Sequence, residues 1–161
     1  MGGNSLNNRY EYASLISLGN NLVYNLQGGY VKQVINTSEY YSYPYNRFLV
    51  NNGDGQSIGV KSGVGALHAK IEAYATINSS ISREVYLGIA INSSNEDIYC
   101  ESYATTTYDT PFINLYVCNP LLTLYGGEKI RMYVYSNNAG EVTINRNVGM
   151  PKLALIVSGI Y

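Results

Sequence analysis

The chain has 161 residues, of which 46% are apolar and only 13% are charged, and its formal net charge is -1 at pH 7. This length suits one domain with a buried core, and the apolar fraction excludes a disordered chain. The charge is too small for nucleic-acid binding, which needs a basic patch, and no run of about 20 apolar residues is present to cross a membrane.

β-Branched and aromatic runs bounded by Gly, Asn, Asp and Pro recur along the chain, and helical spacing is not sustained anywhere. Many short strands at near-regular spacing indicate an all-β sandwich or barrel, which we predict as one domain over residues 1–161. In chain order the predicted strands are Tyr10–Leu18, Leu22–Leu26, Tyr30–Ile35, Arg47–Val50, Ser57–Lys61, Ala66–Ile77, Glu84–Ile91, Asp97–Tyr103, Phe112–Cys118, Leu121–Leu124, Lys129–Tyr135, Glu141–Asn145 and Lys152–Ile160.

Residues 1–55 are rich in Asn, Tyr and Gly, and we interpret them as less regular outer strands and a long surface loop of the same sandwich. Tyrosine makes up 18 of the 20 aromatic residues. Consecutive tyrosines cannot all point inward, and a tyrosine combines apolar area with a hydroxyl. The sequence therefore predicts an interface or ligand surface at Tyr40, Tyr41, Tyr43 and Tyr45, which either docks on another protein or stacks on the sugar rings of a glycan.

The C-terminal third carries the clearest strand signals. Alternating residues at 130–135 indicate a strand at a sheet edge, whereas the continuous apolar run Lys152–Ile160 indicates a central strand that is covered on both faces. Before the strand Lys129–Tyr135, Gly126-Gly127 predicts a turn in which one glycine has positive φ.

Cys100 and Cys118 are the only cysteines. A hairpin of Asp97–Tyr103 with Phe112–Cys118 would place them almost opposite each other, but we favour two small apolar side chains without a bridge. The N-terminus has no basic region followed by an apolar core, so we expect no signal peptide and reduced thiols.

No pattern of residues indicates catalysis, a cofactor or a metal. His68 is the only histidine, and alternation places it on the same strand face as Lys70 and Glu72, so a structural role is favoured over a general base. Glu96-Asp97 could hold a calcium ion, but a solvated turn fits better because the oxygen ligands lack a loop pattern. A cupin-like enzyme would need several metal-ligating histidines. We expect that the protein is not an enzyme.

The second half of the chain, residues 59–161, resembles the C1q/TNF-like jelly-roll family. The segment 124–130 is similar to the family motif Leu-x-x-Gly-Asp-x-Ile, with Glu128 in place of the aspartate. Residues 65–71 are similar to the family's glycine followed by a long central strand. Residues 85–92 are similar to the next strand, which ends at an asparagine turn, and residues 152–161 are similar to the closing apolar strand. The resemblance implies a jelly-roll sandwich with residues 59–161 as its core, and a homotrimer whose inner sheets pack around the three-fold axis.

Trimeric heads of this family also occur at the tips of bacteriophage fibres. The resemblance therefore implies a bacteriophage virion protein made in the host cytoplasm: a fibre, head-fibre or decoration subunit with itself and other virion proteins as partners, contacting a host-surface glycan. The alternative is a carbohydrate-binding β-sandwich module of a bacterial protein. Neither interpretation involves nucleic acid or a membrane.

Overall fold

A computed structural model describes residues 10–17, 21–37, 39–43, 47–92, 98–145 and 153–160. These residues contain no helix, and hence no helical segment that is long and apolar enough to cross a membrane. The strands are β1 (Tyr10–Ile16), β2 (Leu22–Leu26), β3 (Gln33–Val34), β4 (Glu39–Tyr43), β5 (Leu49–Asn51), β6 (Ser57–Val60), β7 (Ala66–Asn78), β8 (Arg83–Ile91), β9 (Ile98–Thr106), β10 (Phe112–Tyr125), β11 (Lys129–Ser136), β12 (Gly140–Ile144) and β13 (Leu153–Ile160).

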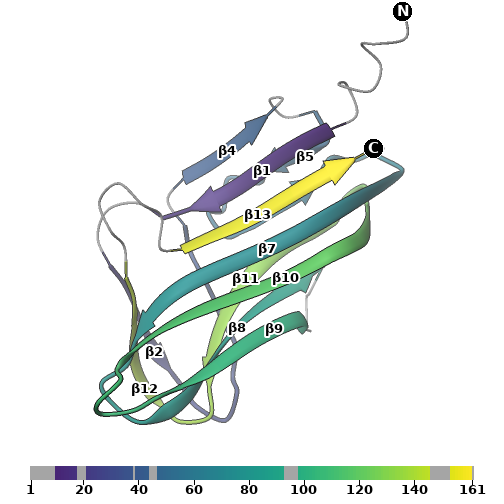
Figure 1. The fold of residues 1–161 in the computed structure, drawn as a ribbon. Helices are drawn as coiled ribbons and strands as arrows, with labels where there is room; N and C mark the ends of the chain where they lie inside the picture. Colours follow the sequence, from purple (N-terminus) through teal and green to yellow (C-terminus); the bar gives the residue numbers. More distant parts are fainter. Residues whose placement is uncertain are drawn as a thin grey trace, which may run out of the picture.

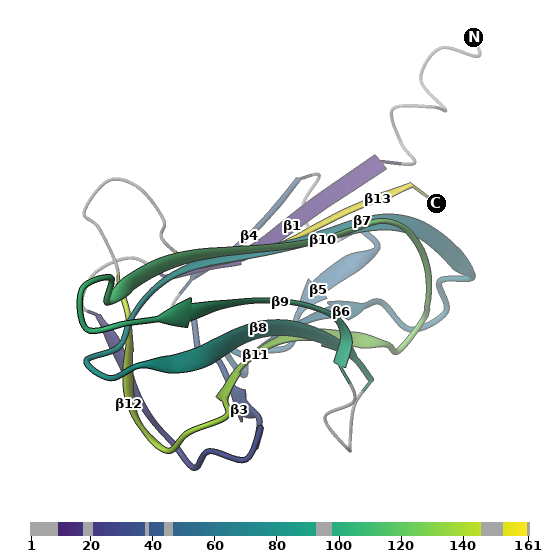
Figure 2. The same ribbon diagram turned by 60° about the horizontal axis from the view of Figure 1, so that its bottom comes forward.

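The strands form two sheets that face each other across the core (Figure 1). The seven-stranded sheet has the order β2-β12-β7-β13-β1-β4, and β10 also pairs with β7. The six-stranded sheet has the order β5-β6-β11-β8-β9, and β3 pairs with β11. Figure 2 shows β1, β7, β10 and β13 in one layer, with β8, β9 and β11 in the other. The predicted all-β sandwich is confirmed.

The long strand β7 organises the seven-stranded sheet, because β13 pairs with it on one side and β10 on the other. Its side chains alternate between the core and the outer face, as the sequence pattern predicts. Those that point into the core are at most 2% exposed: Leu67, Ala69, Ile71, Ala73, Ala75 and Ile77. β13 lies between β1 and β7, so the prediction of a central strand is confirmed. Lys152 and the side chains of β13 lie outside the described residues, and the predicted cover of both faces stays a prediction.

β10 is one continuous strand where the sequence predicts two strands separated by a turn at Asn119-Pro120. It pairs with β7 along its length, and the register shifts between Asn119 and Leu122. Proline has no N–H to donate, so within a sheet it is confined to edges and bulges. Pro120 meets both conditions, since β7 is the only hydrogen-bonded neighbour of β10 among the described strands. The Asn-Pro pair therefore marks a β-bulge.

The hairpin that would place Cys100 and Cys118 opposite each other does not form between β9 and β10. β9 pairs with β8 and β10 with β7, so the connection at residues 107–111 crosses between the sheets, which lie about 10 Å apart in sandwiches. Cys100 packs against the core, whereas Cys118 lies opposite Glu72 on the outer face. Both are free, half-buried thiols. Burial, with a contribution from Cys118, raises the pKa of Cys100 to about 11, which makes it an unreactive thiol. Their redox state in the cell stays a prediction.

Three further sequence expectations need correction. Residues 39–43, interpreted as part of a surface loop, form β4, which pairs with β1. The strand predicted at Tyr30–Ile35 is only two residues long, because Tyr30 has a turn conformation with φ of 62°. β11 is not a sheet edge but lies between β6 and β8. Its alternation arises because Tyr133 and Tyr135 point away from the core into a second, smaller apolar cluster.

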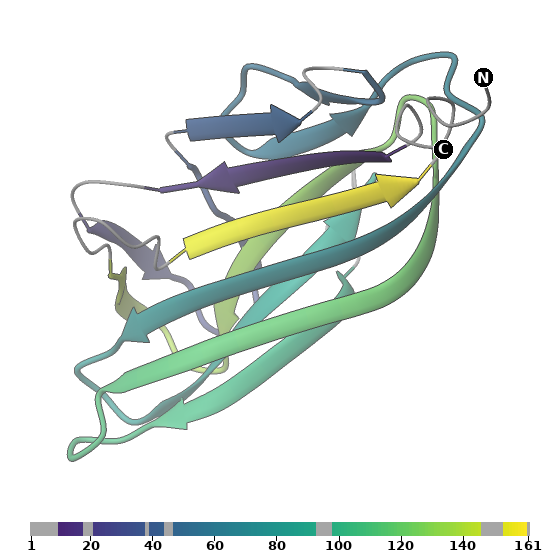
Figure 3. The same ribbon diagram turned by 45° about the horizontal axis from the view of Figure 1, so that its top comes forward.

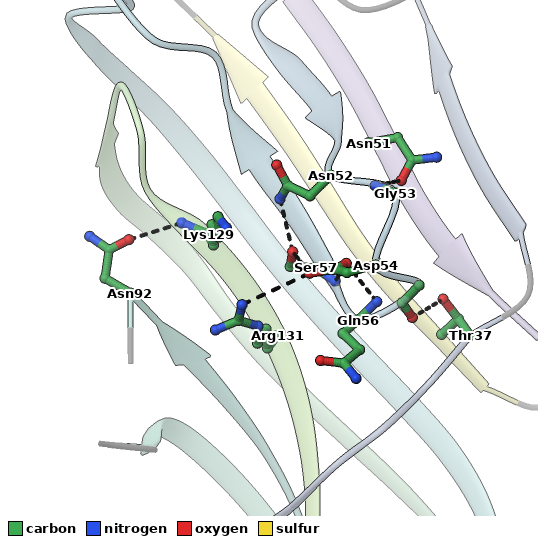
Figure 4. A network of polar contacts seen from close by, with 11 residues as sticks. Thr37, Asn51, Asn52, Gly53, Asp54, Gln56, Ser57, Asn92, Lys129 and Arg131 are labelled. Atoms are coloured by element: carbon green, nitrogen blue, oxygen red, sulfur yellow. Dashed lines mark hydrogen bonds and ion pairs between the residues drawn. The ribbon is translucent and has the colours of Figure 1, made fainter. Parts of the chain in front are cut away.

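Side-chain hydrogen bonds hold the turn between β5 and β6 beside β11 (Figure 4). Asp54 Oδ1 accepts the backbone N–H groups of Gln56 and Ser57 at 2.8 and 2.9 Å, in the manner of an Asx turn. Asp54 Oδ2 accepts the Ser57 hydroxyl at 2.8 Å and lies 3.9 Å from Arg131 Nη2. Partial burial acts to raise the pKa of Asp54, but the hydrogen bonds and Arg131 outweigh it and lower the pKa. The carboxylate thus stays ionised and fixes the turn.

The two adjacent glycines of the predicted motif have different roles. Gly127 has a φ of 91°, which confirms the predicted positive φ, and a Cβ there would meet open space. A Cβ on Gly126 would lie 2.7 Å from the carbonyl oxygen of Val64 and 3.0 Å from the carbonyl oxygen of Lys61. Gly127 therefore permits a backbone conformation with positive φ, and Gly126 permits its turn to contact the backbone of residues 61–64.

A buried carboxylate links the two sheets. Glu11 on β1 is fully buried, and its oxygens accept the backbone N–H groups of Arg47, Phe48 and Leu49 at the start of β5. β1 belongs to the seven-stranded sheet and β5 to the six-stranded sheet. Hydrogen bonds to an ionised acceptor are stronger than neutral ones, so this contact fixes one end of the sandwich.

Candidate interaction surfaces

The first candidate surface is the side of the seven-stranded sheet that points away from the core. We call it the tyrosine face and define it by Tyr12, Tyr41, Tyr43, Tyr74 and Tyr116. Tyr43 lies opposite Tyr12 in the strand register, and Tyr74 lies opposite Tyr116. Directly opposed residues of an antiparallel pair share one face. β4, β1, β13, β7 and β10 lie side by side in Figure 3, so rings from distant parts of the sequence gather on one surface.

The tyrosine face is exposed and nearly neutral. Tyr43 is 74% exposed and Tyr116 is 55% exposed. Lys70 and Glu72 pair with each other, because Lys70 Nζ lies 3.0 Å from Glu72 Oε1, and the Tyr116 hydroxyl donates to the same oxygen at 2.6 Å. The hydrogen bond from Tyr116 lowers the pKa of Glu72, and the same bond raises the pKa of Tyr116. The face therefore carries aromatic area and few unpaired charges.

The predicted tyrosine cluster is divided by strand alternation. Tyr41 and Tyr43 lie on the tyrosine face, and the Tyr41 hydroxyl donates to Glu39 Oε2 at 2.7 Å. Tyr40 points the other way and packs against the core. Tyr45 lies outside the described residues. The structure thus brings two of the four predicted residues together on one surface, and no observation tests their predicted role.

The second candidate surface is the outward side of the six-stranded sheet. Tyr135, Tyr86 and Tyr103 lie directly opposite one another on β11, β8 and β9, and we call this row the tyrosine ladder. The rings of Tyr135 and Tyr86 stack with centroids 5.1 Å apart, and those of Tyr86 and Tyr103 stack at 4.9 Å. Tyr30 packs its edge on Tyr86 at 5.6 Å. Aromatic pairs in these geometries stabilise a sheet beyond their buried area.

A pocket of about 540 Å³ opens beside the tyrosine ladder. Its lining combines aromatic and aliphatic walls with one cation and one carboxylate: Tyr30, Lys32, Tyr86, Ile98, Tyr99, Cys100, Glu101 and Tyr135. Lys32 Nζ lies 5.7 Å from the centroid of the Tyr135 ring, and the Tyr135 hydroxyl donates to Glu101 Oε2. The volume lies within the range of small-molecule sites.

Gly88 makes room for the floor of the pocket. It lies on β8, one outward position along from Tyr86. A Cβ there would lie 2.9 Å from Ile98 Cδ1 and 3.0 Å from the hydroxyl oxygen of Tyr135. A glycine inside a strand often marks such a close approach. Because Gly88 has no side chain, the Tyr135 hydroxyl can reach across β8 to Glu101.

The environment of the tyrosine ladder keeps its hydroxyls protonated. Burial raises the pKa of Tyr86 to about 12, and a hydrogen bond to Glu84 acts in the same direction. Burial also raises the pKa of Tyr135, with the hydrogen bond to Glu101 as the second cause. Both hydroxyls are therefore hydrogen-bond donors at neutral pH.

We expect an alkaline loss of stability that depends on the tyrosine ladder. Tyrosine titrates near pH ~10 in unfolded chains, so above that pH the unfolded state releases protons that folded Tyr86 and Tyr135 still hold. The stability that these groups contribute is fully present below pH ~10 and is lost as the pH rises towards their folded pKa values. Urea midpoints measured from pH 8 to pH ~11.5 should fall, and Tyr135→Phe should make the fall shallower. A flat profile would contradict this expectation.

Among the described residues, those with candidate catalytic or metal-binding side chains do not come together. His68 is exposed on the outer face of β7 beside Lys70 and Glu72, as predicted, with its Nδ1 3.4 Å from the Thr123 hydroxyl. Across the described ranges no group of three or more His, Cys, Asp or Glu residues could hold a metal ion. Glu96 and Asp97 lie outside these ranges.

The sequence did contain a signal for the tyrosine ladder. Tyr133 and Tyr135 alternate with Ile130, Met132 and Val134, which are in the core. Large aromatic residues at the outward positions of a strand predict a second packed surface rather than solvent exposure. The partner strands could not be identified in the same way, because register is set by tertiary packing.

Comparison with known proteins identifies the fold. No protein-family model and no curated protein matches the sequence. The solved structure of the Eiger TNF from S. frugiperda is similar over 95% of this chain and 93% of its own, with a TM-score of 0.56 and 9% identity. Murine APRIL at pH 5.0 is similar over 94% of this chain and 100% of its own, with a TM-score of 0.60 and 9% identity. The structure of murine APRIL at pH 8.0 has a TM-score of 0.58 and 8% sequence identity to this chain. The chain has a TNF-like jelly-roll fold.

The TNF-like jelly roll extends beyond the residues that carry the sequence resemblance. The structural similarity covers 94 to 95% of the chain, whereas the resemblance was limited to residues 59–161. Strands β1 and β4 pair within the seven-stranded sheet, and β5 pairs within the six-stranded sheet. The two candidate surfaces thus lie on opposite outer sides of one jelly roll.

Proposed function

We propose that this chain is the subunit of a homotrimer, and that the tyrosine face is the surface through which the copies meet. The exposed aromatic area of this face is the observation that carries the proposal. Tyr43 and Tyr116 lie at opposite ends of the face, and the neighbouring Phe112 is 58% exposed. Large exposed apolar patches on soluble proteins mark interaction sites. The C1q/TNF-like resemblance, which implies trimers packed around their inner sheets, supports the same surface.

The two ends of the tyrosine face differ, so the β4 end of one copy can meet the β10 end of the next in a ring. The β4 end carries Tyr41 and Tyr43, and the β10 end carries Tyr116 and Phe112. If the β4 end of one copy meets the β10 end of the next, the contact is heterologous and closes when the rotation fits. The Lys70–Glu72 pair is already formed within one chain, so burying this part of the face would not isolate either of these two charges.

We further propose that the trimer is a structural protein of a bacteriophage virion, as a fibre, head-fibre or decoration subunit made in the host cytoplasm. The family resemblance supports this proposal, because such heads occur at the tips of phage fibres. The low charge of 13% and the abundance of tyrosine suit a protein that is largely packed against copies of itself and other virion proteins. We expect mass spectrometry of purified particles to detect the chain in a copy number divisible by three. Its absence from the particles would contradict the virion role.

Light scattering tests the trimer. At micromolar concentration the wild-type protein should have three times the 17.8 kDa mass of the chain. Tyr116→Lys adds a second cation beside the Lys70–Glu72 pair at the β10 end of the proposed interface and should shift the mass to that of a monomer, because a buried charge without a partner of its own is costly. Tyr108→Lys is the matched control, since Tyr108 is 87% exposed in the loop before β10 and should leave the trimer intact. A monomeric wild type, or a trimeric Tyr116→Lys variant, would disprove this interface.

A carbohydrate-binding β-sandwich module of a bacterial protein is the second candidate. The pocket beside the tyrosine ladder is the observation that favours it, since aromatic walls and convergent polar groups suit a sugar ring. A monomer in solution that binds a glycan would support this module over the virion subunit.

A further inference from the structure

We propose that the pocket beside the tyrosine ladder binds a neutral pyranose ring of a glycan. The site is separate from the described part of the predicted cluster, residues 40–43, because it lies on the other sheet. It is also independent of the proposed trimer, since the tyrosine face belongs to the seven-stranded sheet and the pocket to the outer side of the six-stranded sheet. Three copies packed through the tyrosine face would leave the pocket open to solvent.

The walls of the pocket offer apolar surface that is open to a ligand. Tyr99 is 53% exposed and Tyr30 is 47% exposed, and Ile98 lines the pocket beside them. One face of a pyranose is a row of C–H groups, and a tyrosine ring can cover such a face while its hydroxyl stays wet. The exposed area of Tyr99 and Tyr30 is what a ligand would bury.

The polar groups of the pocket match the hydroxyls of a sugar. Glu101 accepts one hydrogen bond from Tyr135 and has further lone pairs, and the Lys32 ammonium can donate three hydrogen bonds. A sugar hydroxyl both donates and accepts, so neighbouring hydroxyls can pair with Glu101 and Lys32 together. Glu84 already accepts the hydroxyls of Tyr30 and Tyr86 at 3.3 and 3.0 Å. The positive charge of Lys32 and the negative charge of Glu101 in the lining cancel, which favours a neutral ligand over an ionic one.

The pocket is held in shape before a ligand arrives. The stacked rings of the tyrosine ladder fix Tyr86 and Tyr135 to each other, and Tyr135 is only 3% exposed. Gly88 allows the Tyr135 hydroxyl to reach Glu101, which orients the carboxylate. A site that is rigid when empty loses less conformational entropy on binding. A single sugar ring could therefore bind measurably.

Titration calorimetry with methyl glycosides tests the site. The probes are the methyl glycosides of glucose, galactose, mannose, N-acetylglucosamine and rhamnose, and tetramethylammonium serves as a cationic probe of an aromatic cage. We expect saturable binding of at least one glycoside with a Kd of about 1 mM or tighter, and no binding of tetramethylammonium. Binding of tetramethylammonium alone, or of no probe at all, would overturn the proposal.

Variants connect the binding to the pocket. Tyr99→Ala removes the exposed ring, and Glu101→Gln removes the carboxylate while keeping its size. Each should weaken the bound glycoside about tenfold or more, whereas Tyr108→Ala outside the pocket should not change it. Affinities that remain at the wild-type value in both pocket variants would show that the glycoside binds elsewhere. Circular dichroism should confirm folding of each variant. Light scattering of the same samples reports the oligomer, so failure of the trimer and failure of the sugar site can be told apart.

Discussion

Replacing Glu11 by alanine should lower the free energy of unfolding by about 3–5 kcal/mol. The Glu11 carboxylate is fully buried and accepts the backbone N–H groups of Arg47 at 2.9 Å, of Leu49 at 2.8 Å, and of Phe48 between them. An alanine leaves all three donors without this acceptor, and a buried unsatisfied donor costs about 1–3 kcal/mol. Water can reach the partly buried N–H groups of Arg47 and Phe48, so the sum stays below three full penalties.

Urea unfolding followed by circular dichroism measures this effect, at one protein concentration so that any oligomer affects all samples equally. Glu11→Gln keeps one carbonyl oxygen in place and should cost less than the alanine variant. Glu141→Ala removes an exposed carboxylate from β12 and should change the free energy of unfolding by no more than about 0.5 kcal/mol. If Glu11→Ala is as stable as the wild type, the two sheets are not held together by this carboxylate.

Gly126→Ala should destabilise the protein by about 3 kcal/mol, whereas Gly127→Ala should cost only about 1 kcal/mol. The new Cβ at position 126 would meet the backbone of residues 61–64, with 2.7 Å to the carbonyl oxygen of Val64. Backbone atoms cannot move aside as a flexible side chain can, because Gly126 N–H donates to Val64 and Gly127 N–H donates to Val60 across the same contact. At position 127 the only penalty is the φ of 91°, since a Cβ there meets open space.

The two variants differ by one residue position and carry the same added methyl group, so each serves as the control for the other. Thermal unfolding of both, compared with the wild type, separates steric contact from backbone conformation. Equal losses, or a larger loss for Gly127→Ala, would show that the turns can separate and that conformation alone requires the glycines.

Much of the fold could be predicted from local patterns. The alternation in Ala66–Ile77 identifies β7, because hydrophobic side chains at every second position need one covered face of a strand. The apolar run after Lys152 identifies β13, because hydrophobic side chains at every position need two covered faces. β4 was missed because a run of tyrosines beside a proline is also typical of a loop, and its strand character depends on pairing with β1. Local signals of turns and strands could not show that pairing.

The candidate surfaces could be predicted only in part. Tyr41 and Tyr43 were identified as surface residues, but their alignment with Tyr74 and Tyr116 depends on the register of five strands. The tyrosine ladder depends in the same way on the pairing of β8 with β9 and with β11. A one-residue shift in any of these pairs would move the rings to the opposite face. Sites built across a sheet are therefore visible only after its register is known.

The bulge in β10 has a consequence for self-association. A strand of 14 residues with one edge unpaired among the described strands is a template on which another chain can add a strand and start a fibril. Pro120 offers no N–H at that edge, and the register shift at Asn119 interrupts the flat row of backbone groups. Strand-by-strand growth is disfavoured at this position, while the neighbouring aromatic side chains remain free to make contacts. The β-bulge at Asn119-Pro120 thus disfavours amyloid-like aggregation through this edge, and it leaves the outer faces of the sheets accessible to specific partners.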